Sequence, residues 1–407
     1  MKVLTINHFP IEGSGSGTYT RNIAVHLQKK GHEVCVIMPE NTTSYAEIPN
    51  VRMIPVYFKY TEEIDGMLPF NFPCFTTHPR STMTFYDLED TQLEMYLSAF
   101  KKVIDQAVEE FKPDIIHGQH IWLLSWLATK TGVPCVVTAH GTDLMGYKQS
   151  ERFRKYADET VLSVKRIITI SNDNTELVKE FFPAAADKAV FMQNGYDTER
   201  FYPEPVSKDE ILKTLVSTLR QSEDVSQIPT IKEKIVLFVG KLANFKGVDI
   251  MIEAIRLYED KYPGEITTII AGEGELAESL EKQAKNSNLN NLYFIGYLNS
   301  IQLRQLYSTA DVSLVPSRRE PFGLVAIEAL ACGCPVIATN QGGLTDIINN
   351  DVGALVDVED AQGLAEAIYN ELHHTDRVKR GKNAAKYALE NYAQDSLMDT
   401  LVKIYNM

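Results

Sequence analysis

The chain has 407 residues and a formal net charge of −14, and 44% of its residues are hydrophobic while 23% are charged. This length favours more than one hydrophobic core, and the composition excludes the collagenous, disordered and membrane-spanning classes. The negative charge argues against nucleic acid as a partner.

The first half of the chain alternates short β-rich runs with amphipathic helix patterns. Strands are predicted at 2–7, 33–38, 51–57, 114–117, 134–138, 166–170 and 189–193. Helix patterns lie between several of them, including Tyr19–Lys30 and Gln92–Glu110. Near-continuous apolar strands separated by helices indicate a parallel sheet covered on both faces, which predicts a Rossmann-like domain over residues 1–200.

The second half repeats this scheme and predicts a second Rossmann-like domain over residues 234–387. Its strands are predicted at 234–239, 266–271, 292–295, 311–315 and 335–338. Its helices are predicted at 248–259, 275–285, 300–308, 324–332 and 361–373. The fold class is therefore α/β, with two doubly wound parallel sheets.

Residues 201–233 form the predicted linker between the domains. This segment holds two prolines, a helix pattern around 208–220 and the polar run Gln221–Gln227. A C-terminal helix within 388–407 is expected to cross back to the first domain. Two doubly wound domains would face each other across a cleft between the carboxyl ends of their sheets, where a ligand is expected.

The N-terminus and one basic cluster bear on location. The apolar run Val3–His8 is too short for a secretory signal, so we expect a cytoplasmic protein. One interpretation of the basic cluster is a solvated helix face. The other is a contact with an anionic acceptor or with a membrane surface, in which case the protein would lie peripherally at the inner face of the membrane. Its members are Lys148, Arg152, Arg154 and Lys155.

The loop from Gly240 to Gly247 is the first candidate phosphate site. A strand ends at Gly240 and a helix begins near Gly247, with Lys241 and Lys246 between them. Two cations beside a helix N-terminus suit a diphosphate, although two lysines on a loop are often only solvated.

A second candidate is the glycine-rich loop between the first strand and the first helix, which contains Gly15 and Gly17. Glycines there let backbone amides approach a phosphate closely. The loop is not a P-loop, and it fits a dinucleotide fingerprint poorly. Because Glu40 follows the second strand, a dinucleotide site remains an alternative. The other alternative is a flexible loop that binds no ligand.

Two carboxylates flank an apolar helix in the second half. Pro321 and Gly323 place Glu320 on a loop, and Glu328 is the only charged residue of the helix that follows. A carboxylate there must face solvent or find hydrogen-bond donors such as ribose hydroxyls, because burying it unpaired is costly. Nearby, Cys332 and Cys334 are expected to be small packing residues rather than a metal clip.

Together these motifs resemble the family-4 group of retaining glycosyltransferases with the GT-B fold, over nearly the whole chain. The resemblance includes the Glu-x7-Glu block with a following Gly-Gly, the Gly-Lys and Lys-Gly pairs, Gly272-Glu273-Gly274, Gly296-Tyr297-Leu298 and Asn194-Gly195-Tyr196-Asp197. It implies two Rossmann-like domains facing across a cleft, and a hexosyltransferase that uses a nucleoside-diphosphate sugar.

The resemblance also implies roles for particular residues. Glu320 is expected to bind the transferred sugar and Glu328 the donor ribose, while Lys241 and Lys246 hold the diphosphate. His140, after the strand ending at Ala139, matches the family histidine beside the sugar. Lys241 departs from the arginine that is common in the family, so its contact is expected to be looser. The implied catalytic residues are His140, Lys246 and Glu320, and the implied donor-binding residues are Gly15, Gly17, Gly240, Lys241, Lys246, Gly272, Tyr297, Glu320, Pro321, Phe322, Gly323, Leu324 and Glu328.

The resemblance favours a UDP-sugar donor, with GDP-mannose as the alternative, and a lipid, saccharide or small-molecule acceptor. Neither a cofactor nor an essential metal is expected. The aromatic segment 64–86 is either an acceptor wall or a loop packed on its own domain, and Trp122 and Trp126 are either core or a ligand platform. Sugar-nucleotide epimerase, phosphorylase, NAD-dependent oxidoreductase and non-catalytic sugar-binding protein remain as alternatives.

Overall fold

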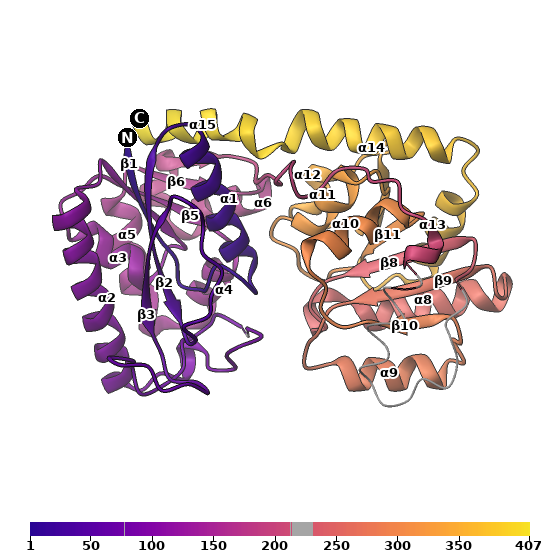
Figure 1. Cartoon of the computed structure of the whole chain (residues 1–407), viewed down its shortest axis with the longest axis horizontal. Coiled ribbons are helices and arrows are strands. Elements are labelled where there is room, and N and C mark those ends of the chain that lie inside the picture. The colour runs from indigo at the N-terminus through magenta and orange to yellow at the C-terminus, as the bar shows by residue number, and fades with distance from the viewer. Residues whose placement is uncertain (77, 212, 214–230) are drawn as a thin grey trace. The chain divides into compact units, whose positions relative to one another are not determined.

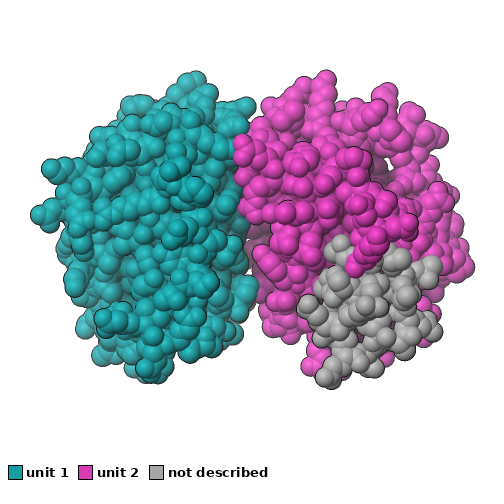
Figure 2. Space-filling view, in the orientation of Figure 1, with its two compact units in different colours: residues 1–194, 394–407 teal, residues 195–393 magenta. Residues whose placement is uncertain are grey.

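The computed structural model describes residues 1–76, 78–211, 213 and 231–407. The predicted helix around 208–220 lies largely outside these residues, and the polar run 221–227 lies wholly outside them. The chain divides into two compact units, the first comprising residues 1–194 and 394–407 and the second residues 195–393 (Figure 2).

Unit 1 is a doubly wound parallel sheet in the order β3-β2-β1-β4-β5-β6-β7, covered by helices (Figure 1). Its strands are β1 Lys2–Ile6, β2 Glu33–Glu40, β3 Arg52–Tyr57, β4 Ile115–Gln119, β5 Cys135–Ala139, β6 Arg166–Thr169 and β7 Ala189–Phe191. Its helices are α1 Gly15–Lys29, α2 Asp90–Phe111, α3 Leu123–Thr129, α4 Thr142–Gln149, α5 Glu151–Ser163, α6 Asn172–Phe181 and α15 Gln394–Asn406, with 3₁₀ turns η1 Phe85–Asp87 and η2 Pro183–Lys188.

The C-terminal helix α15 is part of unit 1. Its apolar residues, including the fully buried Met398 and Leu401, pack in one core cluster with residues of α1 and the sheet. The Tyr405 hydroxyl lies 2.8 Å from Nδ1 of His117 on β4. The segment just before α15 belongs to unit 2, because the Tyr196 amide donates to the Tyr392 carbonyl at 3.0 Å. The division therefore lies at 194 and 393, slightly off the expected boundaries at 200 and 388.

Unit 2 is a second doubly wound parallel sheet in the order β10-β9-β8-β11-β12-β13. Its strands are β8 Lys234–Val239, β9 Ile266–Ala271, β10 Leu292–Phe294, β11 Val312–Val315, β12 Val336–Thr339 and β13 Gly353–Val356. Its helices are α8 Val248–Lys261, α9 Ala277–Asn286, α10 Ser300–Thr309, α11 Leu324–Ala331, α12 Leu344–Ile347, α13 Ala361–Leu372 and α14 Arg377–Tyr392, with the 3₁₀ turn η3 Asn244–Lys246. Buried aliphatic residues of α8 and α13 pack on the sheet and form its core.

The sequence predicts every described strand except the edge strand β13. This strand begins with a glycine, which is normally a turn signal. Here the glycine is required by packing, since a Cβ on Gly353 would lie 1.8 Å from the Val336 carbonyl oxygen, across the pairing of β12 with β13. A close backbone approach at an edge strand therefore explains the missed element.

The sheet order fixes where ligands are expected. In each unit the strand order reverses between the first strand and its neighbour, β1 and β4 in unit 1 and β8 and β11 in unit 2. The loops that leave the carboxyl ends of these strands run in opposite directions and leave space for a ligand. Each unit therefore has one such switch point.

Candidate active site

At the switch point of unit 2, the loop after β8 lies against the loop after β11. The Arg318 amide donates to the Phe245 carbonyl at 2.9 Å. The Gly343 amide, in the loop after β12, donates to the Glu320 carbonyl at 3.0 Å. Three loops from neighbouring strands are thus held together by backbone hydrogen bonds.

Lys246 and Glu320 meet at the centre of this region. The Lys246 ammonium lies 2.5 Å from Oε2 of Glu320, and the same oxygen accepts from the Ser317 hydroxyl at 3.3 Å. The two side chains are 16% and 10% exposed, so the ion pair is only partly screened by water. The structure therefore brings together two of the three residues predicted to be catalytic.

Two glycines allow the loops to approach this closely. Gly247 has φ +65°, and a Cβ there would lie 2.0 Å from the Pro316 carbonyl oxygen. Gly342 has φ +53°, and a Cβ there would lie 2.2 Å from the carbonyl oxygen of Glu320. A side chain at either position would push Lys246 and Glu320 apart.

Arg318 holds the turn that presents Lys246. Its guanidinium donates to both carboxylate oxygens of Asp249, at 2.8 and 2.7 Å, and to the Asn244 carbonyl at 2.7 Å. It also pairs with Glu359. These contacts tie the β11 loop to the η3 turn and to the first turn of α8, and they raise the pKa of Arg318 above its usual value.

Replacing Arg318 by methionine is expected to lower the free energy of unfolding by about 2 kcal/mol, because the half-buried Asp249 carboxylate and the Asn244 carbonyl lose charged hydrogen bonds. Chemical denaturation measures this loss. The control is Arg256→Met, since Arg256 pairs with Glu253 and Asp260 on an exposed face of α8 and should cost less than about 0.5 kcal/mol. Equal losses in the two variants would mean that Arg318 does not clamp the loops.

Glu328 is half-buried on α11. The sequence alone allowed its carboxylate either to face solvent or to meet hydrogen-bond donors. The pKa of Glu328 is raised to about 7, because the effect of burial exceeds the opposing effect of the Arg200 charge. Burial raises the pKa of the Tyr307 phenol, and the nearby Glu328 charge adds to this rise. Among the residues that the structure describes, no protein hydrogen bond to the Glu328 carboxylate is found, which fits a group that awaits donors.

The other predicted donor residues of unit 2 follow the carboxyl ends of β8, β9, β10 and β11. Lys241 lies 3.9 Å from Glu275, and Tyr297 is 71% exposed after β10. The Gly240 amide donates to Ala271 and the Gly272 amide to Gly296, so these glycines join the ends of β8, β9 and β10. The remaining residues lie on the β11 loop and the start of α11, with Phe322 and Gly323 buried and Pro321 and Leu324 half-buried.

Gly15 and Gly17 lie inside α1, which corrects the prediction that they form a loop. Ser14 is the helix N-cap, and its hydroxyl accepts from the Gly17 amide at 3.0 Å. A Cβ on Gly17 would lie 2.3 Å from the Pro10 carbonyl oxygen, so this glycine serves packing. Because the Gly17 amide is already bonded, the first turn of α1 offers fewer free amides than the sequence suggested.

His140 directly follows β5, as predicted, and β5 is the neighbour of β4, one of the two strands at the switch point of unit 1. Its Nε2 lies 2.9 Å from Oε1 of Gln119, and its amide donates to Asp143 at 3.1 Å. Burial lowers the pKa of His140 to about 3. Neither Gln119 nor Asp143 was predicted from the sequence; the polar residues at the carboxyl end of β4 were the available signal for Gln119.

The aromatic segment 64–86 packs on its own unit. Four of its phenylalanines are buried in the core of unit 1, namely Phe70, Phe72, Phe75 and Phe85. Trp122 is fully buried, while Trp126 is half-buried and donates to Glu159. Of the two interpretations offered for each feature, core packing is confirmed for these rings, with Trp126 at the edge of the core.

Glu40 and two arginines of the basic cluster form ion pairs with other residues of unit 1. Glu40 is 2% exposed and accepts from Arg80 at 2.7 Å, so its carboxylate is not offered to a ribose. Within the basic cluster, Arg152 pairs with Asp90 and Arg154 with Glu151. Cys332 and Cys334 are buried free thiols, as expected of packing residues.

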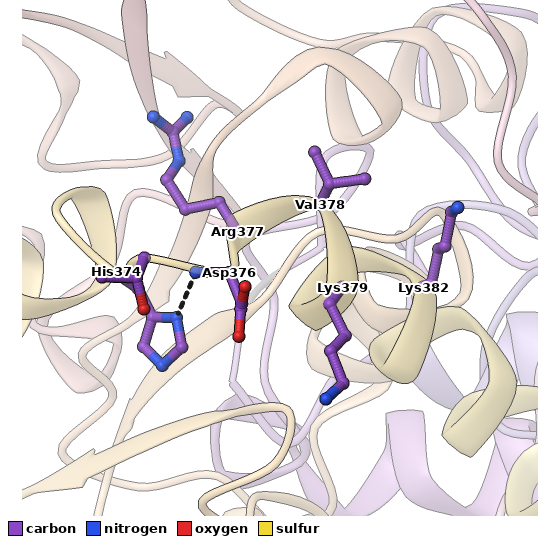
Figure 3. A pocket seen from close by; sticks show the side chains of 7 residues that line it. His374, Asp376, Arg377, Val378, Lys379 and Lys382 are labelled. Carbon is purple, nitrogen blue, oxygen red and sulfur yellow. Dashed lines mark hydrogen bonds between the residues drawn. The ribbon is translucent and has the colours of Figure 1, made fainter.

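A cavity of about 460 Å³ opens at the start of α14 (Figure 3). It is lined by His374, Thr375, Asp376, Arg377, Val378, Lys379 and Lys382. None of the predicted site residues lines it. In the described ranges, His, Cys, Asp and Glu side chains form no group of three or more that could hold a metal ion, and none of the helices described there has the length and apolarity that a bilayer span requires.

Both units match proteins of one class. The family described as Glycosyltransferase Family 4 matches residues 13–200, and that described as Glycosyl transferases group 1 matches residues 221–388. The uncharacterized glycosyltransferase MJ1607 of Methanocaldococcus jannaschii is 27% identical, over 97% of this chain and 94% of its own length. A glycogen synthase of Mycobacterium tuberculosis is 28% identical, over 96% of this chain and 90% of its own length.

A solved structure supports the fold assignment. Anabaena Alr3699/HepE, in complex with UDP and glucose, matches with a TM-score of 0.71 at 19% identity, over 100% of this chain and 99% of that one. Together with the two doubly wound sheets, this likeness confirms the predicted GT-B fold class.

Proposed function

The chain is a hexosyltransferase that belongs to the family-4 glycosyltransferases, and on this premise we propose that it transfers a hexose from a nucleoside-diphosphate sugar with retention of configuration. UDP is the favoured nucleotide, and GDP-mannose is the alternative donor. The solved HepE structure contains UDP and glucose, which supports the choice of UDP. The acceptor is a saccharide, a lipid or a small molecule.

The observation that carries the proposal is the contact between Lys246 and Glu320 at the switch point of unit 2. A cation beside the N-terminus of α8 suits the diphosphate, and a carboxylate suits the hydroxyls of the transferred sugar. The half-buried Glu328 suits the donor ribose, since ribose hydroxyls would supply the donors that it lacks.

The remaining predicted residues complete the donor site in this proposal. Gly240, Lys241 and Gly272 approach the diphosphate, and the backbone near Tyr297 meets the base. Gly15 and Gly17 of unit 1 contribute the end of α1, and His140 lies beside the transferred sugar. Pro321, Phe322, Gly323 and Leu324 line the sugar and phosphate pocket.

Catalysis in this proposal depends on protein cations. As the glycosidic bond breaks, negative charge grows on the β-phosphate, and the Lys246 ammonium and the amides of the α8 N-terminus stabilise it. The acceptor hydroxyl attacks on the face that the leaving group vacates, and the leaving phosphate takes its proton. The reaction needs neither a cofactor nor an essential metal.

Binding of nucleotides to the whole chain tests the donor site. We expect one nucleoside diphosphate among UDP, GDP and ADP to raise the melting temperature without magnesium, with NAD having no effect. At about a hundred times its Kd, the ligand should stabilise the protein by roughly 2.7 kcal/mol. Glu328→Ala should lose this effect at pH 8, where the wild-type carboxylate is ionised. Stabilisation by NAD alone, or by no nucleotide, contradicts the assignment.

A further inference from the structure

Of the side chains that the structure describes, Gln119 is the one that hydrogen-bonds to the imidazole of His140. Its Nε2 lies 2.9 Å from Oε1 of Gln119. An amide oxygen carries no hydrogen, so the imidazole is the donor and its proton is on Nε2. In a neutral imidazole the other nitrogen, Nδ1, is then an acceptor.

The surroundings hold both partners in this geometry. Gln119 is the last residue of β4, is fully buried, and is in register with Thr138 on β5. The His140 amide donates to Oδ1 of Asp143. The His140 ring lies edge-on to Tyr19, with centroids 5.1 Å apart, and tilted against His120 at 4.7 Å.

The groups around His140 keep it neutral. Its pKa is lowered to about 3, mainly by burial and to a smaller extent by the nearby His117 and His8. His120 and His8 have lowered pKa values themselves because they are buried. The Asp143 carboxylate, whose pKa is raised to about 6, accepts from backbone amides, including those of Ile121 and His140, rather than from the imidazole. Tyr19 is fully buried and its pKa is raised to about 12, so no anion faces the ring from α1.

The Nδ1 atom is the open side of the ring. In the part of the chain that the structure describes, no hydrogen bond to Nδ1 of His140 is found, and this atom is not among the fully buried polar atoms without a partner. By contrast, Nε2 of Gln119 and Nδ1 of His120 are fully buried and unpartnered. The acceptor nitrogen of His140 is therefore the side of the ring that is left open to a ligand at the carboxyl end of β5.

We propose that Gln119 is a positioning residue that holds His140 as the neutral Nε2–H tautomer and so presents Nδ1 as a hydrogen-bond acceptor to a sugar hydroxyl of the bound substrate. The sugar contact rests on the proposed transferase function, whereas the tautomer does not. If the Gln119 side-chain amide were flipped, so that its oxygen and nitrogen exchanged places, its NH₂ group would donate to Nε2 of His140. The imidazole proton would then lie on Nδ1, which would be a donor and could not accept.

Nitrogen-15 NMR of the full chain with labelled imidazoles tests the tautomer directly. Two-bond ¹H–¹⁵N correlations distinguish Nε2–H from Nδ1–H imidazole and from imidazolium, and the His140→Gln variant assigns the signals. We expect the Nε2–H pattern for His140, unchanged between pH 6 and pH 8. An Nδ1–H pattern or an imidazolium overturns the proposal.

The contact to substrate is tested on the same sample. Saturating UDP-glucose should shift the Nδ1 resonance of His140 to lower frequency, as hydrogen-bond acceptance requires, and UDP alone should shift it less. Equal shifts with both ligands, or no shift when binding is seen by thermal stabilisation, overturn the sugar contact. Absence of any binding contradicts the proposed donor and the sugar contact together, while the tautomer result still decides the role of Gln119.

Variants of Gln119 separate positioning from structure. Gln119→Leu should mix the two tautomers and lower kcat by about 10- to 100-fold with little change in KM for the donor. Gln119→Glu should still accept from Nε2–H, so the Nε2–H signal should return and part of the lost kcat with it. The control is Gln394→Leu, since Gln394 is a fully buried glutamine of the same unit on α15, and it should change neither the His140 spectrum nor kcat. A Gln119→Leu variant that is folded and has wild-type kcat overturns the proposal.

Discussion

Replacing Lys246 by alanine is expected to lower kcat by about 100- to 1,000-fold in a protein that remains folded. Lys246 is the cation at the start of α8, and in the proposed reaction it faces the phosphate on which negative charge accumulates. Its contribution is larger in the transition state than in the bound donor, so kcat should fall more than binding weakens. Release of the nucleoside diphosphate, measured at saturating donor and acceptor, gives kcat.

Two further variants make this result specific. Lys246→Arg keeps the charge but changes its geometry, and should lose less activity than the alanine variant. Lys282→Ala removes an exposed lysine of α9 that pairs with the exposed Glu278, and should leave kcat unchanged. Near-wild-type turnover of Lys246→Ala, with a normal melting temperature, would contradict the assignment of Lys246 to the diphosphate.

The sequence predicted the parts of this site that depend on strand order and loop chemistry. Near-continuous apolar runs located the strands, and parallel strands deliver their following loops to one edge of the sheet. Lys246 and Glu320 follow β8 and β11, which are neighbours in the sheet, so their contact follows from topology once both loops are recognised. His140 was identified from the family resemblance, supported by its place at the end of the strand that is β5 in the structure.

What the sequence did not predict depends on contacts between distant segments. The proton position on His140 depends on Gln119, which lies on a different strand, and no local pattern identifies that pair. Ser14 is the N-cap of α1 and accepts from the Gly17 amide, so Gly17 lies in the first turn of the helix although glycines normally indicate a loop. The burial of Glu328 also depends on what packs over α11, because helix periodicity alone leaves that face open to solvent.

Replacing Glu320 by glutamine is expected to have opposite effects on nucleotide binding and on turnover. In the structure the Lys246 ammonium is occupied by Glu320, at 2.5 Å, so a diphosphate must compete with this carboxylate. Glutamine removes the competing charge, and the Kd for the nucleoside diphosphate should fall, by up to about tenfold. Turnover should fall by about 10- to 150-fold, because a charged hydrogen bond to a sugar hydroxyl contributes roughly 1.5–3 kcal/mol.

Calorimetric titration of the nucleoside diphosphate, together with steady-state kinetics, measures both effects on one protein. Glu278→Gln on the exposed face of α9 is the matched control and should change neither. The two site variants then differ in sign, since Lys246→Ala weakens nucleotide binding and Glu320→Gln strengthens it, while both lower turnover. If Glu320→Gln weakens nucleotide binding as well, then Glu320 positions Lys246 for the diphosphate. The proposal that the Glu320 carboxylate competes with the phosphate would then be wrong.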